Sequence, residues 1–479
     1  MQNDARPDIL FLMPDQLRPD FLSCYGADFV QTPNIDALAA AGTRYETCIS
    51  PSPICVPARA SLLTGQSAQA CGVLDNLHWP RPDRARMGVQ TWPERLAAAG
   101  YHTAAIGKMH FYPWDASEGF AQRIIAEDKR HLHIDDDYAA ALRAAGLAKR
   151  HAGTHPGYHA AKGAYTDDTR PGALEVDRWV ATQAAQALLD APADRPLAMM
   201  VGFPGPHCPY DPPSEALARI DPGALPKPHP PTPESERHRD AFVASYRRAW
   251  ADLDYAELDA DQIRGLRHHY AALVERLDAD VGLILDALDH SGRAKRTIVV
   301  FASDHGDYLG DFGLVGKTTF HEPSIRVPLI VRDPRAKVIG GVSDQLATLP
   351  DLHPTFLDWA GLVPPAYCDG TVLGRADPER IVTGVTAHGV MARDAAWKLV
   401  RYRNGTEALF HLPDETTDRM QEAPKVRARL DQALTTDLLR GFLAAHADKR
   451  VAEAQAPEGH AFHRRGWQRP YPAAVKPHS

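Results

Sequence analysis

The chain has 479 residues, of which 44% are hydrophobic and 24% are charged, and its formal net charge is -8 at pH 7. This composition is ordinary for a soluble globular enzyme, and the length suffices for one large core plus a smaller domain. The acidic balance argues against nucleic acid as a partner. Because no apolar run approaches the ~20 residues that span a bilayer, we also expect no membrane partner.

Cysteine usage and the N-terminus indicate the compartment. The six cysteines are scattered, which is too sparse for a disulfide framework, and no CxxC zinc pattern is present. Residues 1–8 run directly into an apolar segment, without the charged region and small-residue cleavage site of a signal peptide. We therefore expect a reducing environment and a cytoplasmic protein.

The first predicted elements form a βα unit. Residues 8–14 are a continuous apolar run, as expected of a parallel strand that is covered on both faces, and Asp15 and Gln16 follow it. A polar cap at Thr32 and a proline after it predict a helix over residues 35–41. Because ligands of open α/β sheets gather at the carboxyl ends of strands, Asp15 and Gln16 are candidate site residues.

The next predicted element is a short helix that begins at Cys55. Residues 53–65 read Pro-Ile-Cys-Val-Pro-Ala-Arg-Ala-Ser-Leu-Leu-Thr-Gly, with a proline in the first turn and Gly65 as the stop. Helix N-termini favour anions, so Cys55 lies where an anionic group is stabilised. The plain alternative is a small buried thiol beside a helix start.

Apolar strands and amphipathic helices alternate through the rest of the larger part of the chain. Strands are predicted over residues 103–106, 197–203, 297–302 and 327–331, and helices over 176–189 and within 262–288. This alternation predicts an α/β fold with a mostly parallel sheet sandwiched by helices. Residues 115–172 and 221–236 lack periodicity, so we expect insertions that set specificity.

A change of texture after residue 363 predicts a second unit. Two strands, 398–402 and 408–412, flank a hairpin signal around Asn404 and Gly405, and a helix follows within 425–446. We predict an N-terminal domain over residues 1–363, a smaller C-terminal α+β domain over 364–455 and an irregular tail over 456–479.

Asp304 and His305 directly follow the strand over residues 297–302, so we expect them at the same sheet edge as Asp15 and Gln16. A divalent cation suits such a group, because clustered carboxylates without a counter-charge repel each other. The nitrogen donor of His305 and the neutral amide of Gln16 suit Mn²⁺ at least as well as Ca²⁺. For either pair alone, an ordinary strand-end turn is the alternative.

The run from Cys55 to Gly65 resembles the signature of type I sulfatases, Cys-x-Pro-x-Arg-[Ala/Ser]-x-Leu-[Leu/Thr]-[Thr/Ser]-Gly, in which the cysteine is oxidised to formylglycine. Further segments match this family: Gly107-Lys108-Met109-His110, Pro206-His207-Cys208-Pro209, Gly316-Lys317 and the Asp75-Asn76 pair of choline sulfatases. Asp-Gln and Asp-His replace the more common Asp-Asp and Asp-Asn. That departure resembles the branch with choline sulfatases and phosphonate monoester hydrolases.

The resemblance implies an alkaline-phosphatase-like fold and hydrolysis of a sulfate monoester to an alcohol and inorganic sulfate. It implies one divalent metal ion, Ca²⁺ or Mn²⁺, and a maturation enzyme that makes formylglycine from Cys55. The metal ligands so implied are Asp15, Gln16, Cys55, Asp304 and His305. The implied catalytic residues are Cys55, Arg59, Lys108, His110, His207 and Lys317, with Asn76 binding the substrate.

Individual roles also follow from the resemblance. The converted Cys55 is the nucleophile, and Arg59 offsets its charge. Lys108 and Lys317 meet the charge of the sulfate. His207, together with Lys317, protonates the leaving oxygen, and His110 then acts on the second hydroxyl of the hydrated aldehyde to release sulfate.

Other functions stay open at this point. A phosphonate monoester or phosphodiester hydrolase would share the Asp-Gln and Asp-His pairs, and an unmatured Cys55 would leave a noncatalytic anion-binding protein. No motif identifies the alcohol part of the sulfate ester. Association of identical chains into a homo-oligomer is a further open alternative. We interpret the histidines that match no motif as packed or surface residues, namely His131, His133, His151, His155 and His159.

Overall fold

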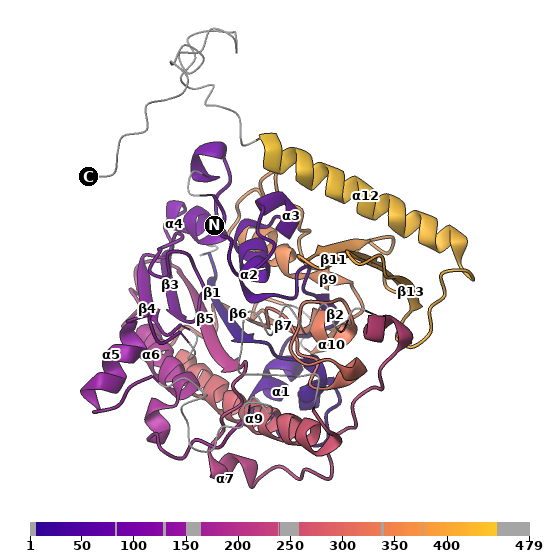
Figure 1. Cartoon of the computed structure of the whole chain (residues 1–479). Coiled ribbons are helices and arrows are strands. Elements are labelled where there is room, and N and C mark those ends of the chain that lie inside the picture. The colour runs from indigo at the N-terminus through magenta and orange to yellow at the C-terminus, as the bar shows by residue number, and fades with distance from the viewer. Residues whose placement is uncertain are drawn as a thin grey trace, which may run out of the picture.

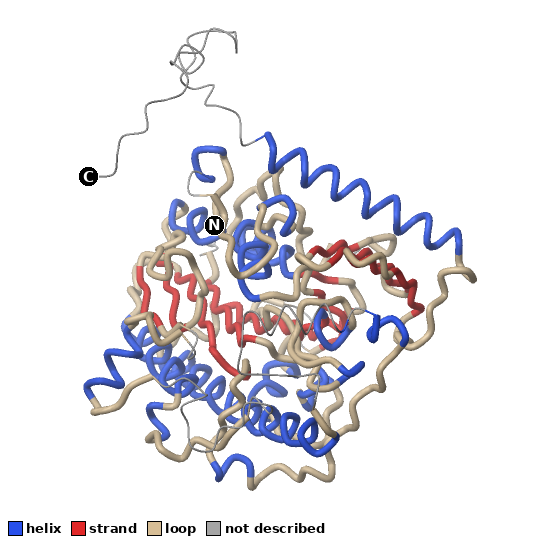
Figure 2. Tube along the Cα trace, viewed as in Figure 1, coloured by secondary structure: helices blue, strands red, loops and turns tan. Residues whose placement is uncertain are grey.

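The computed structural model describes residues 6–81, 84–127, 131–149, 164–237, 239, 258–336, 340–375 and 377–447. The expected tail over residues 456–479 lies outside these ranges, as do His151, His155 and His159. Figures 1 and 2 show a central sheet with helices on both sides and a smaller sheet beneath a long helix.

The large sheet has nine strands in the order β4-β3-β5-β1-β6-β7-β2-β8, with β9 beside β2. They are β1 (Asp8–Asp15), β2 (Thr43–Ile49), β3 (His102–Gly107), β4 (Gln122–Ile125), β5 (Leu197–Pro206), β6 (Thr297–Ala302), β7 (Arg326–Arg332), β8 (Gly341–Ser343) and β9 (Ala347–Thr348). Strand β7 pairs antiparallel with β6 and β2, and the other pairings are parallel. The predicted mostly parallel α/β sheet is therefore confirmed.

Strand β1 lies at the centre of this sheet, between β5 and β6. All eight of its residues are buried, and Phe11 pairs with Met200 on one side and Val300 on the other. Burial on both faces explains why its sequence is continuously apolar rather than alternating. The end of β1 therefore opens at the middle of the sheet's carboxyl edge.

Helices cover both faces of the large sheet, and α12 packs on the smaller sheet described below. They are α1 (Pro33–Ala40), α2 (Cys55–Thr64), α3 (Ala68–Cys71), α4 (Trp92–Ala98), α5 (Asp137–Ala144), α6 (Val176–Asp190), α7 (Ser214–Leu217), α9 (Ala260–His290), α10 (Glu322–Ile325), α11 (Leu352–Trp359) and α12 (Pro424–Ala447). Short 3₁₀ helices are η1 (Pro19–Phe21), η2 (Ser23–Tyr25), η3 (Arg84–Met87), η5 (Gly172–Leu174), η7 (Asp311–Gly313) and η8 (Leu349–Asp351).

Alternate residues of β1 belong to two hydrophobic cores. Leu10 and Leu12 join the core that contains buried side chains of α1, α6 and α9. Phe11 and Met13 join the core that contains side chains of α2, α4 and α11. Helix α9 is the long helix predicted within residues 262–288, and a capping box of Asp259 with Gln262 begins it.

The C-terminal part forms a second, antiparallel sheet. Its strands are β10 (Val382–Val385), β11 (Gly389–Arg393), β12 (Trp397–Tyr402) and β13 (Glu407–His411), and helix α12 packs on one face (Figure 1). The hairpin and the α+β character are as predicted. Met391 and Val400 pack with Ile49 and Phe320 of the larger unit, and the boundary at residue 364 stays a prediction.

The helices also bear on membrane association. Within the ranges given above, none combines the length and the apolar character that crossing a bilayer requires.

Candidate active site

Asp15 and Asp304 meet at the carboxyl edge of the large sheet. Asp15 ends β1, and Asp304 follows β6 by two residues. The backbone N–H of Gln16 donates to Asp304 Oδ1 at 3.0 Å, which ties the two strand ends together. Both carboxylates, Gln16 and His305 are buried. The structure thus brings together the side chains that the strand ends predicted.

Cys55 is the first residue of α2, and its sulfur faces this group. Sγ lies 3.0 Å from Lys317 Nζ, 3.3 Å from His305 Nε2 and 3.8 Å from Asp15 Oδ1. Helix α2 ends at Gly65, whose φ of 72° is the left-handed conformation that glycine adopts readily. The short helix predicted at Cys55 is therefore present, and its positive end faces the carboxylates.

Positive charge around the thiol changes its acidity. Burial raises the pKa of Cys55, but Lys317, His305 and Lys108 outweigh burial and hold the pKa well below its ordinary value. Thiols at helix N-termini beside cations are anionic and reactive for the same reason. By contrast, burial raises the pKa of Cys71 to about 12.

The two carboxylates of the site titrate in opposite directions. Burial and the Cys55 thiolate raise the pKa of Asp15. Lys108, His207 and Lys317 together outweigh them, so the pKa of Asp15 lies well below its usual value. Burial raises the pKa of Asp304, and the negative charge of the neighbouring Asp15 adds to this rise. The site therefore holds one firmly ionised carboxylate and one that lacks enough counter-charge.

Arg59 lies one turn after Cys55 and connects three parts of the site. Its Nε donates to Asp304 Oδ2 at 3.0 Å, Nη2 to Asp15 Oδ2 at 3.2 Å and Nη1 to the backbone oxygen of Lys108 at 2.8 Å. The side chain is fully buried. The planar guanidinium thus fixes α2, β1, β6 and the segment after β3 relative to one another.

Two lysines bring cationic groups to the same point. Lys108 follows β3, and its Nζ lies 2.8 Å from Asp15 Oδ2. Lys317 Nζ lies 2.9 Å from Gln16 Oε1, 3.0 Å from Cys55 Sγ and 3.0 Å from His305 Nε2. Both lysines are buried, which a surface charge would not be.

The two predicted catalytic histidines lie at the same end of the sheet. His110 is buried, and among the described residues its Nδ1 has no hydrogen-bond partner. Burial raises the pKa of Cys55 and the nearby cations lower it. A hydrogen bond from His110 lowers this pKa as well, by a smaller amount. His207 follows β5, its Nδ1 lies 2.6 Å from the Cys208 backbone oxygen, and its charge helps to lower the pKa of Asp15.

Asn76 reaches the start of α2. Its Oδ1 accepts from the backbone N–H of Val56 at 3.0 Å, which satisfies one of the unpaired donors at the helix N-terminus. The neighbouring Asp75 holds the same loop through the N–H of Leu77 at 2.8 Å. The predicted substrate-binding residue is therefore next to Cys55, with a structural contact of its own.

Three residues near the site were not singled out by the sequence. Buried Glu127 accepts the backbone N–H of His110 with both carboxylate oxygens at 3.1 Å. Buried Asp307 contacts the Gln16 amide. The ring of His131, which we interpreted from the sequence as a packed or surface residue, lies 5.7 Å from the His110 ring. Only Asp307 could have been noticed in the sequence, because it is an acidic residue three positions after Asp304.

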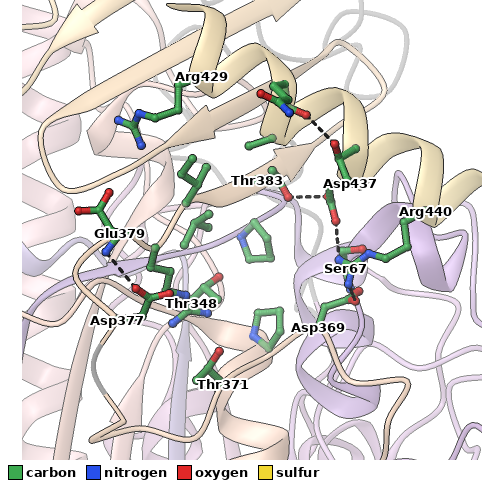
Figure 3. A pocket seen from close by; sticks show the side chains of 18 residues that line it. Ser67, Thr348, Asp369, Thr371, Asp377, Glu379, Thr383, Arg429, Asp437 and Arg440 are labelled. Carbon is green, nitrogen blue, oxygen red and sulfur yellow. Dashed lines mark hydrogen bonds and ion pairs between the residues drawn. The ribbon is translucent and has the colours of Figure 1, made fainter. Parts of the chain in front are cut away.

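The site is also more enclosed than a helix mouth at a surface cleft would be. Cys55 is fully buried, as is every residue of α2. A separate cavity of about 640 Å³ lies between α12 and the loops after α2 (Figure 3). There, Arg440 pairs with Asp369 at 2.9 Å, and Thr383 donates to Asp437 at 2.6 Å. Arg440 also pairs with Asp437, so this arginine offsets the charge of two aspartates in the lining.

The donor set of the site fits a divalent cation. Asp15, Cys55, Asp304 and His305 each offer one ligand atom, and these atoms lie within 4.8 Å of one another. Gln16 adds an amide oxygen beside them, which already accepts a hydrogen bond from the Lys317 ammonium. Positive charge therefore already stands among the atoms that a cation would bind. Carboxylate, amide, imidazole and thiolate donors together suit a transition metal.

His305 has the tautomer that a metal ligand needs. Its Nδ1 lies 3.0 Å from the Gly306 backbone oxygen, which only accepts, so Nδ1 carries the hydrogen. The other nitrogen, Nε2, faces Cys55. Burial lowers the pKa of His305, but Asp304 and Cys55 together outweigh burial and raise it. A bound cation would displace that proton, so metal affinity would rise with pH.

Comparison with known proteins agrees with this geometry. The sequence profile of the Sulfatase family matches residues 7–362. A choline-sulfatase of Rhizobium meliloti is 30% identical over 95% of this chain and 90% of its own length. An arylsulfatase of Clostridium perfringens is 27% identical over 78% of this chain and 79% of its own.

Solved structures give the fold. The crystal structure of a phosphonate monoester hydrolase of Agrobacterium radiobacter superposes with a TM-score of 0.78, covering 91% of this chain and 96% of that one at 22% sequence identity. At that identity the likeness concerns the alkaline-phosphatase-like fold alone. With a profile match across most of the chain and the buried cysteine, carboxylate and lysine group, the chain belongs to the sulfatase family.

Proposed function

We propose that this protein is a sulfatase, which hydrolyses a sulfate monoester to an alcohol and inorganic sulfate with formylglycine made from Cys55. The observation that carries the proposal is the position of Cys55 Sγ at the first turn of α2, 3.0 Å from Lys317 Nζ and 3.8 Å from Asp15 Oδ1. The names of the two curated relatives support sulfate esters as the substrate class.

Position 55 supplies the nucleophile. Asp15, Gln16, Asp304 and His305 would hold a divalent ion, which would make the hydroxyl group that hydrated formylglycine offers for attack on sulfur more acidic. The chain's own contribution is a fixed frame, because Arg59 locks both carboxylates and α2 in one arrangement.

The lysines bind the anionic head of the ester. Lys108 and Lys317 are buried cations at the positive end of α2, so they meet a tetrahedral anion where water screens their charge little. Asn76, held beside Val56, is placed to donate from its amide nitrogen, since its oxygen already accepts from the backbone.

Two histidines move protons. Nδ1 of His207 faces the Cys208 carbonyl, so Nε2 is the atom that gives a proton to the leaving alcohol oxygen. His110 takes a proton from position 55 to release sulfate, and Glu127 fixes its backbone. Both assignments come from the family resemblance, and the burial of the two histidines at this end of the sheet supports them.

A phosphonate monoester or phosphodiester hydrolase is the second candidate. The Asp15-Gln16 and Asp304-His305 pairs favour it, because the resemblance places this pattern in the phosphonate monoester hydrolases as well. Parallel rates on p-nitrophenyl sulfate, bis-p-nitrophenyl phosphate and p-nitrophenyl phenylphosphonate separate the two. A sulfatase hydrolyses the sulfate ester fastest.

The decisive experiment combines maturation with activity. The full chain is produced with and without a formylglycine-generating enzyme, the peptide that contains Cys55 is examined by intact-mass analysis, and choline, aryl, alkyl and sugar sulfates are assayed. We expect turnover only in the preparation with aldehyde at position 55. Activity in protein that retains the thiol overturns the mechanism, and converted protein that hydrolyses no sulfate ester overturns the proposed substrate class.

Metal selectivity forms a second test. We expect Mn²⁺ to bind the chelated protein at least as tightly as Ca²⁺, because His305 supplies a nitrogen donor. Replacement of His305 by alanine should weaken Mn²⁺ binding more than Ca²⁺ binding. Equal losses for the two ions, measured by titration calorimetry, would speak against His305 as a ligand.

A further inference from the structure

Asp307 is a buried aspartate beside the site that takes part in no step described so far. One oxygen, Oδ2, accepts from Gln16 Nε2 and from the Tyr210 hydroxyl. The other, Oδ1, accepts from the backbone N–H groups of Leu309 and Gly316, both at 3.0 Å. A carboxylate with four donors is rigidly fixed, so it can fix what it touches.

The contact with Gln16 determines which end of the amide faces the site. A glutamine amide has a donor end and an acceptor end, and they exchange by rotation. Nε2 meets Asp307, which only accepts when ionised, and Oε1 meets the Lys317 ammonium, which only donates. The reverse orientation would break both hydrogen bonds, so this network fixes the amide.

We propose that Asp307 is a positioning residue for the metal site, because it turns the oxygen of Gln16 toward the atoms that hold the ion. The inference rests on the metal site of the proposed function. Without Asp307, the amide can present its nitrogen, which is not a ligand, and the site would lose one donor of its set.

Asp307 also acts on Lys317. Its Oδ1 holds the N–H of Gly316, the residue directly before Lys317, and Gly316 adopts a φ of 81°. The carboxylate thereby places Gln16 and the lysine that donates to it in one frame. Removal of Asp307 would loosen both partners of the Lys317–Gln16 hydrogen bond.

The same contact explains an amide at position 16. A carboxylate there would meet the Asp307 carboxylate without an intervening donor, and two like charges at this distance inside a protein repel strongly. An ionised aspartate at position 307 therefore favours an amide rather than a carboxylate at position 16. Exchange of the two groups, Gln16→Glu with Asp307→Asn, keeps the shapes and the total charge and restores a donor facing an acceptor.

Mn²⁺ binding tests the inference without reference to turnover. Asp307→Asn, Gln16→Glu and the double variant are chelated, desalted and titrated with Mn²⁺, with free Mn²⁺ followed by electron paramagnetic resonance. We expect Asp307→Asn to bind roughly 10- to 100-fold more weakly, as for other partners of metal ligands. Gln16→Glu reports what the added carboxylate contributes to Mn²⁺ affinity by itself. The double variant should recover most of the affinity. Thermal unfolding with chelator present reports the fold of each variant.

Asp278→Asn is the matched control. Asp278 of α9 also accepts from a side-chain amide, Asn34 Nδ2 at 2.8 Å in the first turn of α1, and it is not among the clustered ligand atoms, so its substitution should leave Mn²⁺ affinity unchanged.

The outcomes separate the two ideas. Equal Mn²⁺ binding by wild type and Asp307→Asn overturns the role of Asp307 and leaves the metal site intact. A wild type that binds neither Mn²⁺ nor Ca²⁺ overturns the metal site, and this inference with it. If Asp307→Asn does not fold, the double variant decides: recovered folding and Mn²⁺ binding support the pairing, and failure of both contradicts it.

Discussion

Nε of Arg59 donates to Oδ2 of Asp304 across 3.0 Å, which joins helix α2 to the end of β6. The same side chain reaches Asp15 and the Lys108 carbonyl. Buried arginine on two carboxylates is well suited to this role, since its donors are arranged in a fixed plane.

Arg59→Lys keeps the charge but removes this geometry. A lysine can serve one or two of the three acceptors, so at least one buried acceptor loses its donor, and we expect the free energy of unfolding to fall by about 2–4 kcal/mol. Urea unfolding of the chelated protein measures it. Arg335→Lys is the control, because its ion pair with Asp333 is on the surface. A loss equal to the control would contradict the locking role.

Cys55→Ala should remove turnover and keep the fold. The variant has no side chain that can be oxidised, whereas the secondary structure of α2 does not depend on the thiol, since alanine is a strong helix former. Turnover of a sulfate ester and far-UV circular dichroism test both parts. Cys71→Ala serves as the control, because that thiol has a raised pKa and donates to the backbone oxygen of Ala68. Turnover by Cys55→Ala would refute the nucleophile.

His207→Ala should slow substrates in proportion to how poor their leaving group is. A general acid contributes on the order of 10²- to 10⁴-fold where an alkoxide must depart, and far less where the leaving group is p-nitrophenolate. We expect a large loss on an alkyl sulfate and a small loss on p-nitrophenyl sulfate. His290→Ala, an exposed histidine on α9, is the control. Equal losses on both esters would point to a positioning role instead.

A buried ionic group elsewhere predicts a pH dependence of stability. His321 Nε2 lies 2.8 Å from Glu234 Oε2, and Nδ1 lies 3.5 Å from Glu415 Oε1. Burial lowers the pKa of His321, but the two carboxylates outweigh burial and raise it from 6.5 to about 9. The proton is therefore held more tightly in the folded chain than in the unfolded one.

The sign of this effect follows from linkage. Since the folded pKa is the higher one, the contribution of His321 is complete below about pH 6.5 and is lost as the pH rises through about 9. A shift of this size corresponds to ~3 kcal/mol. We expect the difference in unfolding free energy between wild type and His321→Gln to shrink across this range. A difference that stays constant with pH, measured by urea unfolding, would contradict it.

The sequence predicted the parts of the site that depend on local pattern. The apolar run of β1 and the run of β6 placed Asp15 and Asp304 at one edge, because parallel strands share their carboxyl ends. The proline and glycine around α2 placed Cys55 at a helix start. Each of these inferences depends on residues that are close together in the sequence, so a single sequence is enough to make it.

What escaped prediction depends on distant contacts. Asp307 matters because its carboxylate meets Gln16, which lies 291 positions away in the chain, and no periodicity encodes such a pairing. Glu127 follows β4, a half-exposed edge strand inside a segment predicted as an insertion. The antiparallel direction of β7 was equally hidden, since an apolar run has no sign of its orientation.

The complete burial of α2 sets a limit on when its first residue can be modified. An enzyme that oxidises Cys55 needs the peptide in its own cleft, and the closed core leaves none of this helix within reach. Under the proposed function, the modification would therefore compete with folding during or shortly after translation. Chains that fold first would retain the thiol, so the rate of folding would set the fraction of molecules with an aldehyde at position 55.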